Sequence, residues 1–505
     1  MIKRKLIRQF TSLGAVLCGG MLLMSASPAM ADVPFTFVNR STYSDDQVYI
    51  AVIGEINGHV WIDPSTGSVR EMSVSDNSVA GPVIGGNKGP GNNGMYAKCF
   101  VQLSKIPNKT VNVPTIAGSR IYIGFGSPLY FYFFGRSGGY AAPNMANPTD
   151  PNQGIRFELI ELTNTAQNGI WVNTTRVDAY QHPMGLEVRG AGGFSVKTGE
   201  IIGHEAILKL WKDSVSATFQ GCLNSATGVI SAPSKTTPFQ EHGSQENFFK
   251  AYIDAIWSKY ATQDLVFNSG NAGVWSGRVI GGRFVFHNLT VHFGNDTGII
   301  SARPSTQEVL EGKGVLAEDV QKLPNQQLDK VVQAQFCAAV NRHALDLDAA
   351  SGVVQDWSDS SKYYKTMPYN EYAKFWHRGD ISWLRHSYGF CYDDVFEYSS
   401  TIHAQTPLAA TVTLGGFASD PTSAVERCGM APSLEMRVSA DRNQLVFGSS
   451  QQGNLSLTDL QGHRVLEARV TDGRVDLGGR VGHGEYLWVL NSSSNLWKGK
   501  LLIAP

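Results

Sequence analysis

Three carboxylates lie close together in one short segment that is otherwise rich in apolar and β-branched residues. The segment, Arg156–Pro183, reads RFELIELTNTAQNGIWVNTTRVDAYQHP and contains Glu158, Glu161 and Asp178. An Asn-Gly pair in its middle is the strongest short-range signal for a β-hairpin. Two carboxylates held by a rigid sheet can act as a general acid and a general base, so the segment is a candidate site of hydrolysis.

The predicted hairpin geometry selects Glu161 and Asp178 as the pair. A two-residue turn at Asn168-Gly169 places Glu161 opposite Arg176, with Asp178 two positions further along the same face. Diagonal neighbours of this kind have Cα atoms about 7–8 Å apart. Glu158 has the opposite parity and points to the other face of the sheet. A β-bulge or a turn with an odd number of residues would reverse this choice.

The neighbours of the two carboxylates suit different roles. Glu161 shares its face with Phe157 and Leu159, and apolar neighbours favour the neutral carboxyl of a general acid. Asp178 shares its face with Arg176 and hydroxyl residues, a setting that keeps a general base ionised. Inverting glycosidases separate their carboxyls by about 6.5–9.5 Å and retaining ones by about 5–5.5 Å, so the expected spacing favours inversion. The alternative is a solvated strand face whose carboxylates only pair with nearby arginines.

The first 31 residues have the pattern of a secretory signal peptide. Four basic residues precede an apolar run from about Leu13 to Leu23, and Ala29-Met30-Ala31 offers small residues for cleavage before Asp32. The apolar run is short for a membrane span, and no later segment has about 20 uninterrupted apolar residues. We therefore expect a protein that is secreted or carried on the cell surface.

Composition excludes some classes of function. The chain has 42 basic and 43 acidic residues, so it lacks the excess of positive charge that nucleic-acid binding requires. Only 17% of its residues are charged, and glycine is abundant with 53 residues, which is typical of a loop-rich β protein.

Cysteine and histidine spacing predicts no metal site and no cofactor. Neither C-x-x-C nor H-x-x-x-H occurs, and the histidines are expected to be structural. Up to two disulfides could form in an oxidising compartment, but their pairing cannot be read from the sequence. The five cysteines beyond the signal peptide are Cys99, Cys222, Cys337, Cys391 and Cys428.

Hydrophobic periodicity divides the chain into regions. Residues 33 to about 190 contain β-branched and aromatic runs typical of buried strands. The next region, about 190–382, adds helices among short strands, and strand-like sequence returns between Ile381 and Val412. The clearest predicted strands are Gln47–Gly54 and Arg120–Phe134, and the clearest predicted helices are His204–Gln220, Ser244–Tyr260 and Pro324–His343.

The tail, residues 434–505, reads as a separate small β-sandwich of short alternating strands. Three of its features resemble the C-terminal sorting domain of type IX secretion: a strand followed by Asp459–Gly462, a Gly484-x-Tyr486 strand and a last strand with lysine. That resemblance implies the type IX secretion machinery as a partner. The alternative is a carbohydrate-binding or spacer module.

Several blocks of the sequence resemble, in order, the signature of glycoside hydrolase family 64, the β-1,3-glucanases with a thaumatin-like β domain. The segments RFELIELT and WVNTTRVDAYQHPMGL resemble the family's W-D-K-V-E-F-T strand and the V-D and proline-containing segment that follows it. The blocks run from about residue 35 to about residue 415. The other blocks are Phe37–Ser41, Val48–Gly54, Pro143–Asn152, Cys337–Ala344 and Tyr388–Val395.

The resemblance implies a role for each matching residue. Glu161 falls on the family's general acid and Asp178 on its general base, in an inverting hydrolysis that needs no cofactor. Thr163, Trp171 and Thr175 fall on positions that line the glucan groove, and the Trp171 ring could stack on a sugar face. The interval from Glu161 to Asp178 is 17 residues, one longer than the usual pattern, which leaves the placement of Trp171 and Thr175 open.

We therefore expect a secreted, monomeric endo-β-1,3-glucanase that is mainly β with an α/β part. Its catalytic region would span residues 32–430. There a thaumatin-like β-sandwich or barrel domain (about 33–189 and 383–430) and a mixed α/β domain (about 190–382) would flank a wide groove for β-1,3-glucan. Asp393 and Asp394, the rival carboxylates, are expected to be structural.

Two other functions stay open. One is a thaumatin-like protein that binds β-1,3-glucan without cleaving it, and the other is a surface adhesin or structural protein of the cell wall. The presence of both Glu161 and Asp178 argues against the first, because binding alone needs neither carboxylate.

Overall fold

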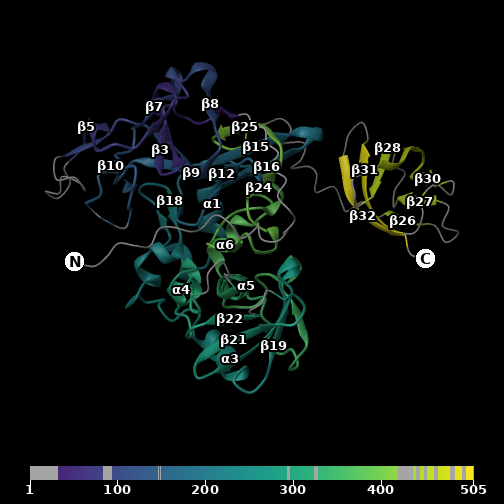
Figure 1. Ribbon diagram of the computed structural model, residues 1–505. Coiled ribbons are helices and arrows are strands. Elements are labelled where there is room, and N and C mark those ends of the chain that lie inside the picture. Colours follow the sequence, from purple (N-terminus) through teal and green to yellow (C-terminus); the bar gives the residue numbers. More distant parts are fainter. Residues whose placement is uncertain are drawn as a thin grey trace, which may run out of the picture. The chain divides into compact units, whose positions relative to one another are not determined.

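The chain divides into two compact units, Met1–Ala418 and Ser419–Pro505. The computed structural model (Figure 1) describes the first unit over residues 32–82, 94–145, 147, 149–292, 296–322 and 328–418. In the second unit it describes residues 436–438, 444–447, 452–459, 464–477, 481, 484–491 and 496–503.

Two sheets build the larger part of the first unit, here called the β lobe. One has five strands in the order β16 (Ser195–Gly199), β15 (Met184–Gly190), β25 (Pro407–Leu414), β1 (Val33–Asn39) and β8 (Thr110–Val113). The other has the order β24 (Ile402–Ala404), β13 (Gly169–Thr174), β12 (Arg156–Thr165), β9 (Ile116–Phe125), β2 (Val48–Glu55), β3 (His59–Ile62) and β4 (Val69–Glu71), with β7 (Val101–Gln102) beside β2. Two-stranded ribbons, β5 (Asn77–Ala80) with β6 (Met95–Ala97) and β10 (Tyr132–Gly135) with β11 (Gly139–Ala141), complete it.

The inner faces of the two sheets share one hydrophobic core, which determines where each side chain of β12 points. Phe35 and Val412 from the five-stranded sheet pack in this core with Ile50, Ile121 and Ile160 from the larger sheet. Because side chains alternate along a strand, the even-numbered residues of β12 face the core. Its odd-numbered residues therefore lie on the outer face.

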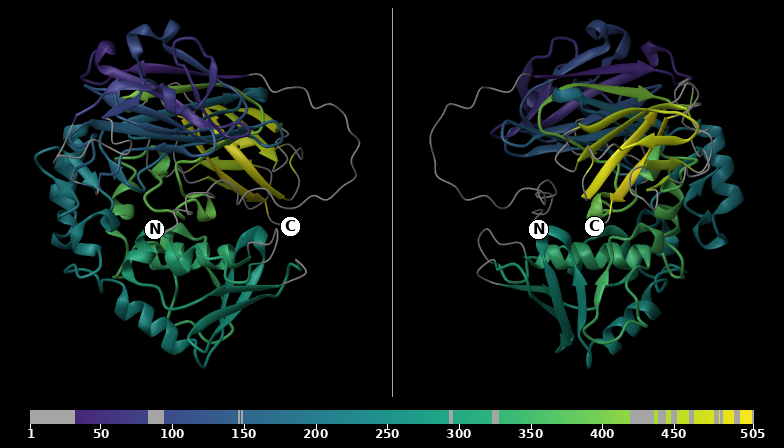
Figure 2. Two further views of the ribbon diagram at one scale, coloured as in Figure 1. Left: turned by 60° about the vertical axis from the view of Figure 1, so that its left-hand side comes forward. Right: turned by 90° about the vertical axis from the view of Figure 1, so that its right-hand side faces the viewer.

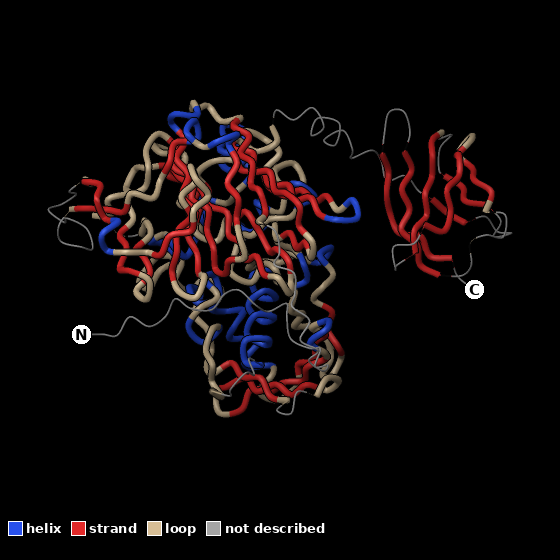
Figure 3. Tube along the Cα trace, turned by 45° about the horizontal axis from the view of Figure 1, so that its top comes forward, coloured by secondary structure: helices blue, strands red, loops and turns tan. Residues whose placement is uncertain are grey.

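In the second part of the first unit, here called the α/β lobe, most helices lie between the β lobe and a sheet, and the helix Lys250–Lys259 lies beside that sheet (Figures 1 and 3). The helices are α1 (His204–Ser214), α2 (Ala217–Gln220), α3 (Lys250–Lys259), α4 (Thr306–Glu311), α5 (Leu328–Arg342) and α6 (Glu371–Trp376). The five-stranded sheet has the order β22 (Thr297–Ile300), β21 (Arg283–Asn288), β20 (Val274–Ile280), β19 (Leu265–Asn268) and β23 (Val354–Asp356). A small sheet of β14 (Ala179–Tyr180), β18 (Val229–Ser231) and β17 (Leu223–Asn224) lies near the β lobe.

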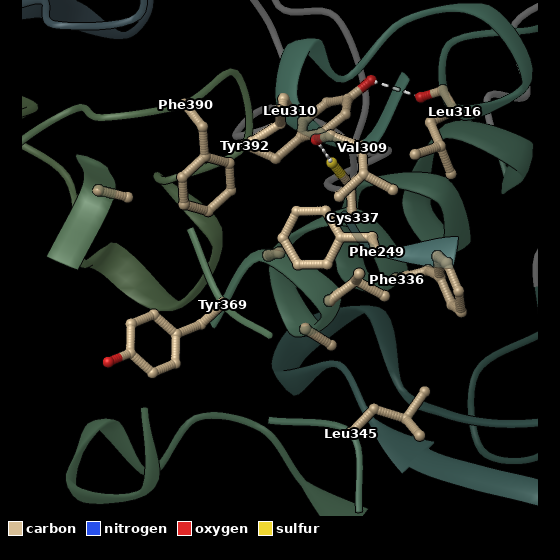
Figure 4. Close-up of a cluster of buried hydrophobic side chains, with 14 of the residues drawn as sticks. Phe249, Val309, Leu310, Leu316, Phe336, Cys337, Leu345, Tyr369, Phe390 and Tyr392 are labelled. Atoms are coloured by element: carbon tan, nitrogen blue, oxygen red, sulfur yellow. Dashed lines mark hydrogen bonds between the residues drawn. The ribbon is translucent and has the colours of Figure 1, made fainter. Parts of the chain in front are cut away.

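Helix α5 runs through the core of the α/β lobe, and the two further views of Figure 2 show it from different sides. Phe336 and Cys337 of this helix pack among Phe249, Val309 and other apolar side chains (Figure 4). The Cys337 thiol donates to the Val309 carbonyl at 3.1 Å.

The second unit has two sheets around its own core. One sheet has the order β26 (Met436–Val438), β27 (Gln444–Phe447) and β30 (Arg474–Asp476). The other has the order β29 (Arg464–Val470), β28 (Gly453–Asp459), β31 (Gly484–Asn491) and β32 (Leu496–Ile503). Leu445, Leu457 and Trp488 are among the buried residues that join the two sheets.

Several expectations from the sequence can be compared with this fold. The three predicted helices are present, with α3 shorter than predicted and the His204–Gln220 segment divided into α1 and α2. From the sequence, up to two disulfides were possible, but all four described cysteines are free, and Cys428 lies outside the described residues. In the part of the chain that the structure describes, no helix is long and apolar enough to cross a membrane.

A buried ion pair ties α5 to the segment that returns to the β lobe. The Arg342 guanidinium, 1% exposed, donates to a carboxylate oxygen of Asp393 at 3.0 Å. Asp393, fully buried, also contacts His377 Nε2 at 2.7 Å and accepts from the Gly389 amide at 2.8 Å. Asp393 therefore supports the fold, as expected from the sequence.

We expect Asp393→Asn to lower the free energy of unfolding by about 3 kcal/mol or more, because a buried guanidinium would lose its counter-charge. Urea unfolding followed by tryptophan fluorescence measures the change. The matched control is Asp348→Asn on the exposed segment after α5, with an expected change below about 0.5 kcal/mol. Equal effects of the two substitutions would contradict the structural role of Asp393.

Candidate active site

Glu161 lies on the outer face of β12, directly opposite Arg120 of β9. Arg120 donates twice to the same carboxylate oxygen, from Nε at 3.2 Å and from Nη2 at 3.0 Å. The Glu161 side chain is 30% exposed, so a ligand can reach the carboxyl. Phe157 and Leu159 share this face as predicted, but the group in contact with the carboxyl is a cation, which corrects the expected apolar setting.

The register of the hairpin differs from the predicted one. Thr165 pairs with Gly169, so the turn has three residues, and Glu161 lies opposite Asn173 instead of Arg176. Gly169 adopts a φ of +66°, and a Cβ there would lie 2.1 Å from the Ala404 carbonyl oxygen of β24. A three-residue turn of this kind, with a left-handed residue at its end, is the next most common hairpin connection.

Asp178 lies beyond the end of β13, in the loop that crosses to the α/β lobe. Its side chain is 75% exposed and contacts Lys235 Nζ at 3.1 Å. Lys235 also contacts Glu311 of α4 at 3.2 Å, and Glu311 pairs with Lys313. The backbone carbonyl of Asp178 accepts from the Ala232 amide at 2.9 Å. The general-base candidate therefore belongs to a loop held by the second lobe and not to the strand face that was predicted.

Glu158 is fully engaged in holding this loop. Its two oxygens accept hydrogen bonds from the Gln181 and His182 amides at 2.7 and 2.8 Å and from Arg176 Nη1 at 2.6 Å. Arg176 also donates twice to Glu200, at 2.9 and 2.8 Å. Burial disfavours the charged guanidinium, but the two carboxylates outweigh burial and raise the pKa of Arg176. Glu158 is thus a structural carboxylate three residues from Glu161.

The negative charges of three carboxylates act on the thiol of Cys391. Burial raises the pKa of Cys391 to about 12, and the negative charges of Asp394, Glu161 and Asp178 contribute in that order. The structure therefore brings Glu161 and Asp178 to the same region from a strand and a loop. Asp394 joins them there.

Asp394 behaves differently from its neighbour Asp393. It keeps exposed surface, yet the protein atoms around its carboxyl desolvate it and raise its pKa to about 6, with the Asp393 charge adding to the effect. The expected structural role fits Asp393. It does not explain Asp394, which keeps exposed surface although protein atoms surround its carboxyl.

The predicted glucan-contact residues lie in two places. Thr163 and Trp171 form a cross-strand pair on the same outer face as Glu161, because the observed register reverses the parity of β13. Trp171, 37% exposed, stacks on His403 of β24 with ring centroids 3.9 Å apart. Thr175 lies beyond β13, where its hydroxyl accepts from the Val177 amide at 3.2 Å.

Sequence reasoning missed the two cations that contact the candidate carboxylates. Arg120 lies 41 residues before Glu161, and Lys235 lies 57 residues after Asp178, so no local pattern links either pair. Among the described residues, no cluster of histidine, cysteine, aspartate and glutamate could hold a metal ion.

Known proteins that resemble this chain include the following three. A β-1,3-glucanase domain from Clostridium beijerinckii has 35% identity and a TM-score of 0.65, with 76% of this chain and 98% of that chain covered. A laminaripentaose-producing β-1,3-glucanase from Paenibacillus barengoltzii has 26% identity and a TM-score of 0.55, with 78% of each chain covered. A glucan endo-1,3-beta-glucosidase from Cellulosimicrobium cellulans is 26% identical over 432 residues, which cover 81% of this chain and 71% of that protein.

The family comparison covers both lobes of the first unit. Glycoside hydrolase family 64, described as β-1,3-glucanase, matches residues 31–414, a range that includes Glu161, Asp178 and Asp394. Together with the structure that is 35% identical, this match shows that the chain belongs to glycoside hydrolase family 64, the β-1,3-glucanases.

Proposed function

We propose that this β-1,3-glucanase cleaves internal bonds of laminarin-like or curdlan-like chains with inversion, using Glu161 as general acid and Asp178 as general base. The supporting observations are the position of Glu161 beside Arg120 on the outer face of β12 and the exposed position of Asp178 beside Lys235, both within the residues that match the family. The relative from Paenibacillus barengoltzii produces laminaripentaose, and we expect this chain to release short oligosaccharides as well.

Glu161 has a partner for the carboxylate that a general acid leaves after it gives up its proton. The Glu161 proton moves to the glycosidic oxygen as its bond to the anomeric carbon breaks. The carboxylate that remains is then stabilised by the two hydrogen bonds from Arg120.

Asp178 has the exposure and the charge partner that a general base needs. It takes a proton from a water molecule whose oxygen bonds to the anomeric carbon on the face opposite the leaving group. The β-linkage therefore gives an α-anomer. Lys235 contacts the Asp178 carboxylate and restricts its position.

Trp171 would supply the apolar platform for the sugar chain. His403 covers one face of the indole, so the other face is left for a glucose ring. Thr163 lies beside it on the same sheet face, and Thr175 would line the adjoining loop.

The finer expectations about architecture and export are also part of this proposal. We assign a thaumatin-like β domain to about residues 33–189 and 383–430 and the mixed α/β domain to about 190–382. The two sheets with a shared core support a separate β domain, although Phe390 and Tyr392 pack in the core of the α/β lobe. We further assign residues 1–31 to a signal peptide and 434–505 to a sorting-like domain, which makes the enzyme a secreted or surface protein. We also propose that it is a monomer.

We expect Glu161→Gln and Asp178→Asn each to lower kcat on laminarin by about 10²–10⁴-fold, the usual effect of removing a general acid or base. Anomeric proton NMR in the first minutes should show new α-anomer from the unsubstituted enzyme. Glu187→Gln, a carboxylate paired with Arg189 on β15, is the matched control and should keep full activity. New β-anomer would exclude inversion, and a fully active Glu161→Gln enzyme would exclude the assigned acid.

Lys235→Met should lower kcat about tenfold, because the Asp178 carboxylate would lose the contact that holds it in position. Lys235→Arg should restore most of the activity, since it keeps the charge and the contact. Lys209→Met, at an exposed lysine of α1, is the control. An unchanged kcat for Lys235→Met would show that Lys235 does not position the base.

Asp394→Asn should change how stability depends on pH. The pKa of Asp394 is raised from 3.8 to about 6 in the folded protein, so folding favours its neutral form. The stability that this proton contributes is present below pH 4 and is lost as the pH rises through 6. The melting temperature of Asp394→Asn relative to the unsubstituted enzyme should therefore increase between pH 4 and pH 6, and a constant difference would contradict the shift.

A further inference from the structure

A cavity of about 470 Å³ lies in the α/β lobe and contains none of the carboxylates assigned above. Three segments form it: the loop after β23 and the short helical turns Trp383–Arg385 and Val395–Glu397. It is lined by Ser358, Ser360, Ser361, Tyr363, Leu384, Arg385, His386, Phe396, Glu397 and Tyr398. Its volume is within the range of about 300–1,000 Å³ that is usual for small-molecule sites.

The aromatic part of this lining is rigidly supported. The rings of Tyr363 and Tyr398 meet edge to face with centroids 5.3 Å apart. The Arg342 guanidinium lies over both rings, at 4.8 and 5.4 Å from their centroids. His377 stacks on Tyr398 at 4.1 Å. The buried network of Arg342, Asp393 and His377 therefore fixes the two tyrosines before any ligand binds.

The rim of the cavity has an unusual backbone. Leu384, Arg385, Phe396 and Glu397 all have positive φ angles, of 51°, 65°, 62° and 55°. Such residues rarely adopt this conformation, and it persists only where the surrounding structure imposes it. Here His377 Nδ1 contacts the Arg385 carbonyl at 2.8 Å, and Arg342 donates to the Val395 carbonyl at 2.9 Å. Two strained turns are thus held at one cavity by the network that supports its tyrosines.

The polar groups at the rim are available for a ligand. Arg385 and Glu397 are exposed, and neither forms an ion pair with another described residue. One cation and one anion balance, so the lining favours a neutral ligand over a charged one. A fork of guanidinium donors, a carboxylate and the Ser360 hydroxyl suit the hydroxyls of a sugar, while tyrosine rings suit its C–H face. The Ser358 and Ser361 hydroxyls already donate to Asp356 and Asp359 and can act toward a ligand only as acceptors.

The cavity is connected to the catalytic region through the chain. Glu397 follows Asp394 by three residues, and a chain spans at most about 3.5 Å per residue, so their Cα atoms are within about 11 Å. Tyr398 precedes Ile402 by four residues, and Ile402 pairs with Val172 beside Trp171. The cavity therefore lies close to the segment that carries Asp394 and to the strand that pairs with β13.

We propose that this cavity is a distal subsite that binds a neutral β-glucan unit away from the bond that is cleaved. The proposal depends on the glucanase activity of the family and not on the roles assigned to Glu161 and Asp178. Its consequence is that affinity should increase with the length of the substrate until the chain reaches Arg385 and Glu397.

The test uses Arg385→Asn and Glu397→Asn, separately and combined, because asparagine tolerates positive φ angles better than most residues. Steady-state kinetics are measured on laminarin and on laminaritetraose, and melting temperatures confirm folding. We expect the double variant to raise KM for laminarin about five- to twentyfold with kcat unchanged, and to leave kcat/KM for laminaritetraose within twofold. Arg283→Asn, at an exposed arginine of β21, is the matched control and should leave KM and kcat unchanged for both substrates.

The outcomes separate this inference from the enzyme's own activity. An unchanged KM for laminarin in a folded double variant would overturn the distal subsite, while the activity itself remains established by the unsubstituted enzyme. An equal loss on laminarin and on laminaritetraose would also overturn it, because the residues would then act at the cleavage site. No hydrolysis of either substrate by the unsubstituted enzyme would instead contradict the glucanase function.

Discussion

The buried contact of Arg176 with Glu158 and Glu200 is the interaction on which the active region depends. It joins strand β12, the residue that follows β16 and the loop that carries Asp178. The acid candidate and the base candidate come from different elements, so their separation is set by whatever fixes the loop to the strand. A charged group with a carboxylate on each side resists displacement, because moving it would leave buried charges without partners. The separation of Glu161 and Asp178 is therefore set by a buried contact on the opposite face of β12.

The carboxylates of this region divide into two groups by burial. Glu158, Glu200 and Asp393 are buried, each beside an arginine, and they hold segments of backbone in place. Glu161 and Asp178 keep solvent access, and each contacts one cation, of which Lys235 also contacts Glu311. Pairs of a carboxylate with a cationic side chain therefore stabilise the fold where water is excluded, and they serve catalysis where substrate can enter.

Much of the fold could be predicted from the sequence because its signals are local. The strands, the hairpin and helix α5 follow from residue type and periodicity. Asn-Gly favours a two-residue turn, whereas the structure has a turn of three residues. The close approach of Gly169 to Ala404 depends on a strand far along the chain, so no local pattern could predict it. Arg120 and Lys235 could not be predicted, because their partners are distant in sequence. The contrast between Asp393 and Asp394 likewise depends on which of two adjacent side chains turns inward.

The burial of the free cysteines affects how well the chain resists oxidation outside the cell. Burial raises the pKa of Cys99, Cys222, Cys337 and Cys391, so very little of any thiol is in the reactive thiolate form at neutral pH. Oxidation, metal capture and disulfide exchange all proceed through the thiolate. The first unit can therefore remain unmodified in aerated medium without a single cross-link among its described cysteines, and its durability there depends on packing and not on covalent bonds.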